Sequence, residues 1–157
     1  MAVRRTERRD LEPIRSIVAA TGVFNEEEIG IAVELLEVYL NDPRQKDYEI
    51  YTSTDDTGAV NGYICFGPTP ATDATYDMYW IAVDPASHSA GIGTELLRFT
   101  EGVLKARGGR LLVAETSSTA KYDKTRAFYE RKGFEKFAQI REYYRPGDDL
   151  VIYGKYL

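Results

Sequence analysis

Two glycines near the middle of the chain form a turn whose residue types suit the binding of an anion. The turn lies between an apolar run at residues 78–83 and an amphipathic run at residues 94–106, which indicate a strand and a helix. Gly91 and Gly93 let the backbone approach a bulky ligand and adopt φ angles that other residues resist. The helix that follows offers unpaired N–H groups and the positive end of its dipole, so phosphate is the expected ligand.

Two common phosphate-binding motifs do not fit this turn. A dinucleotide fingerprint needs a third glycine or alanine near Leu96, and its glycines follow the strand directly, whereas Gly91 comes eight residues after Val83. A P-loop needs Gly-Lys-Ser/Thr, and no such run follows here. Because the two glycines alone are also compatible with a simple loop, the surrounding elements must decide between these interpretations.

The composition predicts one soluble domain that spans residues 1–157. The chain has 157 residues, of which 43% are hydrophobic and 29% are charged, and this suits a single core. A net charge of −5 gives no electrostatic footprint for nucleic acid. Cys65 is the only cysteine and His88 the only histidine, so we expect no metal centre, and a reducing cytoplasm fits. No apolar run has the length of a membrane span, so we expect no membrane partner.

The hydrophobic pattern predicts an α/β domain with a mixed sheet. Asp10 and Asn25 are the residues that we expect to cap the first two helices. We expect strands at residues 2–6, 48–53, 59–66, 75–83, 110–116, 134–140 and 150–156, and helices at residues 11–20, 26–40, 94–106 and 124–132.

Three stretches resemble the GCN5-related N-acetyltransferase (GNAT) superfamily. Residues 79–85 read Tyr-Trp-Ile-Ala-Val-Asp-Pro, the loop ends Gly91-Ile92-Gly93, and residues 127–134 read Ala-Phe-Tyr-Glu-Arg-Lys-Gly-Phe. The resemblance covers almost the whole chain in element order. It implies the GNAT acyl-CoA N-acyltransferase fold, in which helices flank a mixed, mostly antiparallel central sheet with splayed middle strands.

The resemblance also implies acetyl-CoA as co-substrate. Loop N–H groups would hold the pyrophosphate, and free N–H groups of Ile81 and Val83 would bind the pantetheine arm and the acetyl oxygen. His88 stands where the family usually has Gln or Arg, so the role of its side chain is open. The asparagine that many members carry before the later helix is also missing. The implied coenzyme contacts are Ile81, Ala82, Val83, His88, Ser89, Ala90, Gly91, Ile92, Gly93 and Thr94.

Acetyl transfer to an amine needs a neutral nucleophile, a polarised thioester carbonyl and an acid for the departing thiolate. Tyr129 matches the family tyrosine that protonates the thiolate, and a free tyrosine titrates at about 10. Glu115 matches a glutamate that accepts the amine proton through water in some members. Asp77 and Tyr79, which share one face of a strand, are alternative bases.

The acceptor in this fold lies between residues 22–26 and residues 141–149, which mix aromatic side chains with carboxylates. This mixture suits a cationic amine with some apolar character, either a small molecule or a peptide amine. The expected acceptor contacts are Phe24, Asp77, Tyr79, Tyr143 and Tyr144. The alternative is a catalytically silent acyl-CoA sensor or regulatory module. The sequence leaves the oligomeric state open and is compatible with a homodimer.

Overall fold

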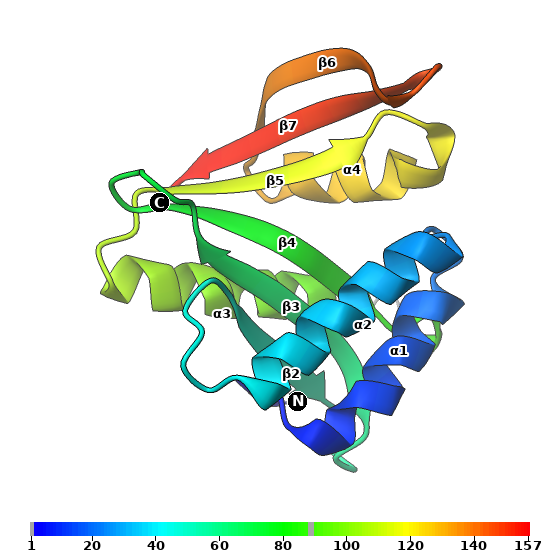
Figure 1. Cartoon of the computed structure of the whole chain (residues 1–157), viewed down its shortest axis with the longest axis vertical. Coiled ribbons are helices and arrows are strands. Elements are labelled where there is room, and N and C mark those ends of the chain that lie inside the picture. Colours follow the sequence, from blue (N-terminus) through cyan, green and yellow to red (C-terminus); the bar gives the residue numbers. More distant parts are fainter. Residues whose placement is uncertain (1, 88–89) are drawn as a thin grey trace.

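The computed structural model of the chain describes residues 2–87 and 90–157. Every predicted helix and strand is present, in the predicted order (Figure 1). The strands are β1 (Ala2–Arg5), β2 (Glu49–Thr54), β3 (Val60–Pro68), β4 (Thr75–Val83), β5 (Leu111–Ser117), β6 (Glu135–Arg145) and β7 (Asp148–Tyr156). The helices are α1 (Leu11–Ala20), α2 (Glu26–Asn41), α3 (Ile92–Ala106) and α4 (Asp123–Arg131), with short 3-10 turns η1 (Arg8–Asp10), η2 (Pro85–Ser87) and η3 (Ala120–Tyr122).

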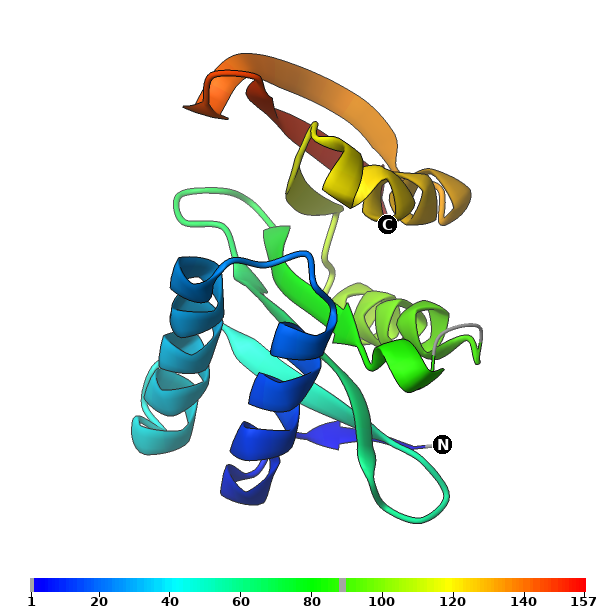
Figure 2. The same ribbon diagram turned by 90° about the vertical axis from the view of Figure 1, so that its right-hand side faces the viewer.

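The strands form one sheet in the order β1-β2-β3-β4-β5-β7-β6. Within residues 2–87 and 90–157, only β4 and β5 run parallel and the other neighbouring strands are antiparallel, as the mixed-sheet prediction expects. Helices α1 and α2 cover one face of the β1–β4 half, and α3 covers the opposite face (Figure 2). The expected fold class is therefore confirmed.

The two middle strands separate along their length. Thr75–Met78 of β4 pair with Leu111–Ala114 of β5, but β4 continues to Val83 and β5 to Ser117 without further pairing between them. Figure 1 shows the two ribbons diverging from this short ladder. The splay places the ends of both strands on opposite sides of a wedge.

Two hydrophobic cores hold the sheet between its helices. One core packs α1 and α2 against the sheet through residues such as Ile14, Leu36 and Tyr63. The other core includes Leu96 and Leu97 of α3 together with residues of β5, α4 and β7. Because this second core draws on elements from both sides of the wedge, it joins the two halves of the sheet.

The first two helices begin differently. Asn25 caps α2 as predicted, since its Oδ1 accepts the Glu28 N–H at 2.8 Å and the Glu28 carboxylate accepts the Asn25 N–H at 3.1 Å. Asp10 occupies the N-cap position of α1 as predicted, but its side chain makes no capping hydrogen bond there. Asp10 lies in η1 with helical backbone angles, and its carboxylate accepts from Arg4 at 2.7 Å and from the Glu7 N–H at 2.8 Å.

Strand β6 is longer than the predicted strand at residues 134–140. Its pairing with β7 passes from Ile140 opposite Leu150 to Arg145 opposite Asp148, so the intervening β6 residues bulge out of the ladder. Glu142 has a φ of 52°, and its N–H donates to Asp149 Oδ1 at 2.8 Å. The bulge breaks the strand alternation, which is why the sequence pattern ended early.

No helix in the described residues is long and apolar enough to span a bilayer.

Candidate active site

The glycine turn leads directly into the N-terminus of α3. Gly91 has a φ of 76° and precedes the first helical residue, Ile92. The Glu95 N–H donates to the Gly91 carbonyl at 3.0 Å, so the N–H groups of residues 92–94 lie ahead of the first helical bond. Gly93 lies close to α4, because a Cβ added there would be 3.4 Å from the Phe128 ring. This geometry suits a phosphate at the helix end.

The other predicted coenzyme contacts divide into three groups. His88 and Ser89 lie outside the described residues, and Ala90 is exposed beside them. Ala82 is only 5% exposed, and its side chain lies in the core beneath α1. Ile81 and Val83 lie on the part of β4 beyond its pairing with β5.

The backbone of β4 presents alternate N–H groups to its two sides. The Asp84 N–H donates to the Asn61 carbonyl of the β3 side at 2.9 Å. Because successive residues of a strand point their N–H groups in opposite directions, Ile81 and Val83 direct theirs away from β3. Both groups therefore face the side where β5 has separated.

A second hollow of about 420 Å³ lies beside α3 and the end of α4. Four cationic side chains gather there, and Lys155 pairs with Glu101 at 2.6 Å. The sequence analysis missed this hollow, although Arg98 follows Thr94 by one helical turn on the same face. Its lining residues are Thr94, Leu97, Arg98, Glu101, Arg131, Lys132, Gly133 and Lys155.

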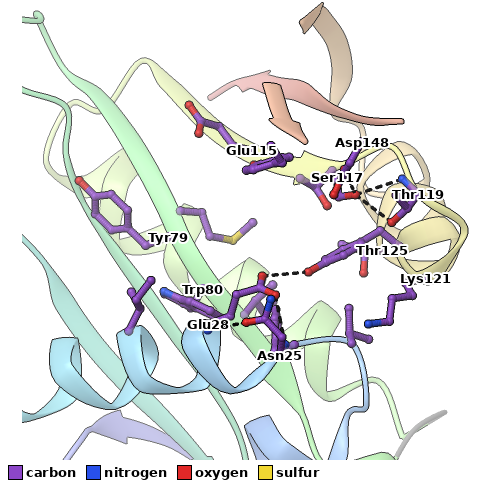
Figure 3. Close-up of a pocket in the computed structure, with 18 of the residues that line it drawn as sticks. Asn25, Glu28, Tyr79, Trp80, Glu115, Ser117, Thr119, Lys121, Thr125 and Asp148 are labelled. Atoms are coloured by element: carbon purple, nitrogen blue, oxygen red, sulfur yellow. Dashed lines mark hydrogen bonds between the residues drawn. The ribbon is translucent and has the colours of Figure 1, made fainter. Parts of the chain in front are cut away.

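The wedge between β4 and β5 contains a cavity of about 670 Å³. Residues from the α1–α2 loop, α2, β4, β5, η3, α4 and the β6–β7 turn line it, as Figure 3 shows for a subset. It brings together six of the predicted catalytic and acceptor residues, which are Phe24, Asp77, Tyr79, Glu115, Tyr129 and Tyr144. Tyr143 is not part of the lining. It is 57% exposed and packs edge-on against Tyr144, with 5.1 Å between the ring centroids.

Tyr129 is held rigidly in the cavity wall. The centroid of its ring lies 5.3 Å from that of Phe134 and 5.6 Å from that of Tyr153, and the residue is 5% exposed. Burial raises the pKa of its phenol above the ordinary value. The side chain therefore stays protonated near neutral pH.

Two carboxylates face the cavity from the neighbouring strands β4 and β5. The pKa of Glu115 is raised, first by partial burial and then by the negative charge of Asp77. Asp77 accepts a hydrogen bond from the Thr69 hydroxyl at 2.7 Å. Burial and the Asp77 charge also raise the pKa of Tyr79. Tyr79 keeps its proton near neutral pH, so Glu115 is a better proton acceptor than Tyr79.

An aromatic cluster forms the wall on the α1–α2 side. The Phe24 ring packs edge-on against the rings of Trp80 and Tyr122, with distances between ring centroids of 4.8 Å and 6.4 Å. The Tyr122 hydroxyl donates to Glu28 Oε2 at 3.3 Å (Figure 3, dashed line from Glu28). Trp80, Tyr122 and Glu28 were missed as site residues, because no local pattern links positions so far apart in the sequence.

A polar network fixes the far end of β5 to the β6–β7 turn. Ser117 donates to the buried carboxylate of Asp148 and accepts the Thr119 N–H at 3.1 Å. Arg126 of α4 donates to the carbonyls of Ser117 at 2.6 Å and Thr119 at 2.9 Å. Burial raises the pKa of Tyr144 to about 12, and the negative charge of Glu115 is the next largest cause. The end of β6 that carries Tyr144, next to this turn, is therefore held close to the strand that carries Glu115.

Within the described residues, no group of three or more His, Cys, Asp or Glu side chains is arranged to hold a metal ion.

Comparison with known proteins identifies one family. A model described as an acetyltransferase (GNAT) domain matches residues 46–136. No curated protein sequence matches the chain. A solved structure from Desulfovibrio desulfuricans, assigned to the GNAT acetyltransferases, is 43% identical with a TM-score of 0.92, and the alignment covers 99% of this chain and 98% of that one.

Two more distant structures share the fold. The ribosomal-protein-S18-alanine N-acetyltransferase of Escherichia coli is 22% identical with a TM-score of 0.76, covering 99% of this chain and 92% of that one. An aminoglycoside 6'-N-acetyltransferase solved with coenzyme A is 15% identical with a TM-score of 0.75, covering 99% of this chain and 97% of that one.

Proposed function

Because the chain belongs to the GNAT acetyltransferase family, we propose that it transfers the acetyl group of acetyl-CoA directly to a primary amine. The observation that carries this proposal is the shared cavity. Tyr129 and Glu115 line one space at the point where β4 and β5 separate, so an acid and a base border the same wedge. That arrangement matches the two proton transfers of acyl transfer from a thioester to an amine.

The coenzyme would enter along the side of the wedge that α3 borders. The N–H groups of residues 92–94 would bind its pyrophosphate at the helix end. The cationic hollow shared by Arg98, Arg131 and Lys132 would attract the remaining phosphate. The N–H groups of Ile81 and Val83 would bind the pantetheine arm and polarise the acetyl carbonyl.

Glu115 would remove a proton from the ammonium form of the acceptor through water. The neutral amine then attacks the thioester carbonyl, so that a C–N bond forms and the C–S bond breaks. Tyr129 would donate its proton to the departing thiolate, and its raised pKa keeps that proton in place until this step. The attacking nitrogen loses its second proton as the amide forms, and this proton would restore the Tyr129 phenol. The net products are the amide, the free thiol and one proton, which Glu115 would release to solvent, and no covalent enzyme intermediate is needed.

The acceptor side of the cavity suits a cation. Asp77 and Glu115 supply negative charge, while Phe24, Tyr79 and Tyr144 supply aromatic surface. The solved structures named for action on an aminoglycoside and on a ribosomal-protein alanine are less than 25% identical to this chain, so they do not choose between small and protein amines.

Release of free thiol from acetyl-CoA, measured over a panel of small amines and peptides, tests the proposal. We expect thiol release that depends on the amine and yields the N-acetylated acceptor. Tight coenzyme binding by calorimetry without thiol release for any acceptor would instead support a silent acyl-CoA-binding sensor.

A further inference from the structure

One side-chain bridge crosses the wide end of the wedge. Tyr122 of η3 lies on the β5 side and Glu28 of α2 on the β4 side, and their side chains meet at 3.3 Å between the Tyr122 hydroxyl and Glu28 Oε2. The two residues are 94 positions apart in the sequence. The bridge therefore connects the two halves of the molecule at the end where β4 and β5 no longer pair.

Both ends of this bridge are fixed by other contacts. The second oxygen of Glu28, Oε1, accepts the Asn25 N–H in the capping box at 3.1 Å. The Tyr122 ring packs edge-on against Phe24, which in turn packs against Trp80 of β4. Burial, and next the charge of Glu28, raise the pKa of the Tyr122 phenol, so its hydroxyl stays protonated and able to donate. The bridge is thus held in place without a ligand.

We propose that the Tyr122–Glu28 bridge is a size filter that restricts the acceptor to small amines. This inference rests on the proposed acetyl transfer. Residues of the α1–α2 loop, η3 and the β6–β7 turn all line the cavity, which has a volume of about 670 Å³. A compact amine fits such a space, whereas a polypeptide must continue beyond its reacting amine. The bridge crosses the cavity lining between η3 and α2, so a polypeptide that leaves on that side would have to break it.

Three substitutions separate the filter from other effects. Tyr122→Phe removes the bridging hydroxyl but keeps the ring that packs against Phe24. Glu28→Gln removes the charge but keeps groups that can hydrogen-bond to both Tyr122 and the Asn25 N–H. Tyr156→Phe changes an exposed tyrosine outside the cavity and serves as the control.

The test compares kcat/KM for butylamine, putrescine and glucosamine with kcat/KM for short peptides that carry a free N-terminal amine or a lysine. For the unmodified protein we expect the best small amine to exceed the best peptide by about 10²-fold. In Tyr122→Phe this preference falls by about three- to tenfold, through a lower KM for peptides, while the KM for acetyl-CoA stays constant. Glu28→Gln and Tyr156→Phe keep the preference.

Each other outcome has a defined meaning. Equal rates with peptides and small amines in the unmodified protein overturn the filter but leave the proposed acetyl transfer standing. An unchanged preference in Tyr122→Phe also overturns it. If thermal melting shows that Tyr122→Phe is unfolded, Glu28→Ala takes its place, and the same unchanged preference counts against the filter. No thiol release with any amine overturns the proposed function and this inference with it.

Discussion

At the scale of single residues, the proposed reaction depends on a proton that Tyr129 keeps until the thiolate leaves. Its burial between Phe134 and Tyr153 raises the pKa of the phenol and fixes the direction of the ring. Tyr129→Phe preserves this packing and removes only the proton donor. We expect kcat to fall by about 10²-fold while the coenzyme Kd is unchanged, as measured by thiol release and calorimetry. Turnover equal to that of the unmodified protein would exclude Tyr129 as the acid.

The pH dependence reports on the base. Glu115 accepts a proton only when ionised, so activity is lost as the pH falls through its pKa, which burial and Asp77 raise. Asp77→Asn removes the neighbouring charge and lowers that pKa. The acidic limb of kcat/KM should therefore move to lower pH when measured with the same amine.

The matched variant Glu115→Gln keeps the shape of the side chain but cannot act as a base. We expect it to lose about 10²–10⁴-fold in rate together with this limb. An acidic limb that does not move in Asp77→Asn would remove Glu115 from the mechanism.

The roles proposed for Tyr129 and Glu115 came from their resemblance to family motifs, and the structure places both on one cavity. Tyr122 and Glu28 could not be found in this way, because only the fold brings η3 to the start of α2. Tyr143 was predicted together with Tyr144, but only Tyr144 lines the cavity, while Tyr143 is 57% exposed.

At the scale of elements, the coenzyme site depends on the turn into α3. Gly91 adopts a φ of 76°, and a Cβ at this position would contact nothing within 4 Å. The cost of Gly91→Ala is therefore conformational, about 1–2 kcal/mol for the left-handed region. We expect a lower melting temperature and a higher KM for acetyl-CoA.

Gly102→Ala is the control, because Gly102 lies in the interior of α3 with equally open space around it. That change should raise stability by about 0.5–1 kcal/mol without affecting the KM. If Gly91→Ala behaves in the same way as Gly102→Ala, the turn does not need its left-handed conformation.

Elements with regular patterns could be predicted from the sequence. Asn25 followed by three glutamates marks the start of α2, and residues 75–83 match β4 at both ends. Two details depended on distant partners. Asp10 pairs with Arg4 instead of capping α1, and β6 continues past Ile140 because Asp149 stabilises the bulge at Glu142.

At the scale of the whole molecule, we expect residues 1–157 to unfold as one domain. Only four residue pairs join β4 to β5, but Leu96 of α3 and Tyr129 of α4 belong to the same core, which spans the wedge. Calorimetry should show one transition with equal calorimetric and van't Hoff enthalpies. Acetyl-CoA at a hundredfold excess over its Kd should raise the midpoint temperature of this transition, because it stabilises the folded state by about 2.7 kcal/mol. Two separate transitions would show that the halves fold independently.

The overall architecture could be predicted because the order of strands and helices is local information, and the resemblance supplied the splay between β4 and β5. The shape of the acceptor cavity could not, since it depends on how the α1–α2 loop, η3 and the β6–β7 turn meet around the wedge.

The central claim is direct acetyl transfer from acetyl-CoA to an amine in one wedge, and bisubstrate initial-rate kinetics test it most directly. If both substrates occupy the cavity together, double-reciprocal plots at several fixed amine concentrations form intersecting lines, and no acetylated enzyme accumulates without amine. Parallel lines, together with an acetyl group retained on the protein, would indicate a covalent intermediate and contradict the proposed mechanism.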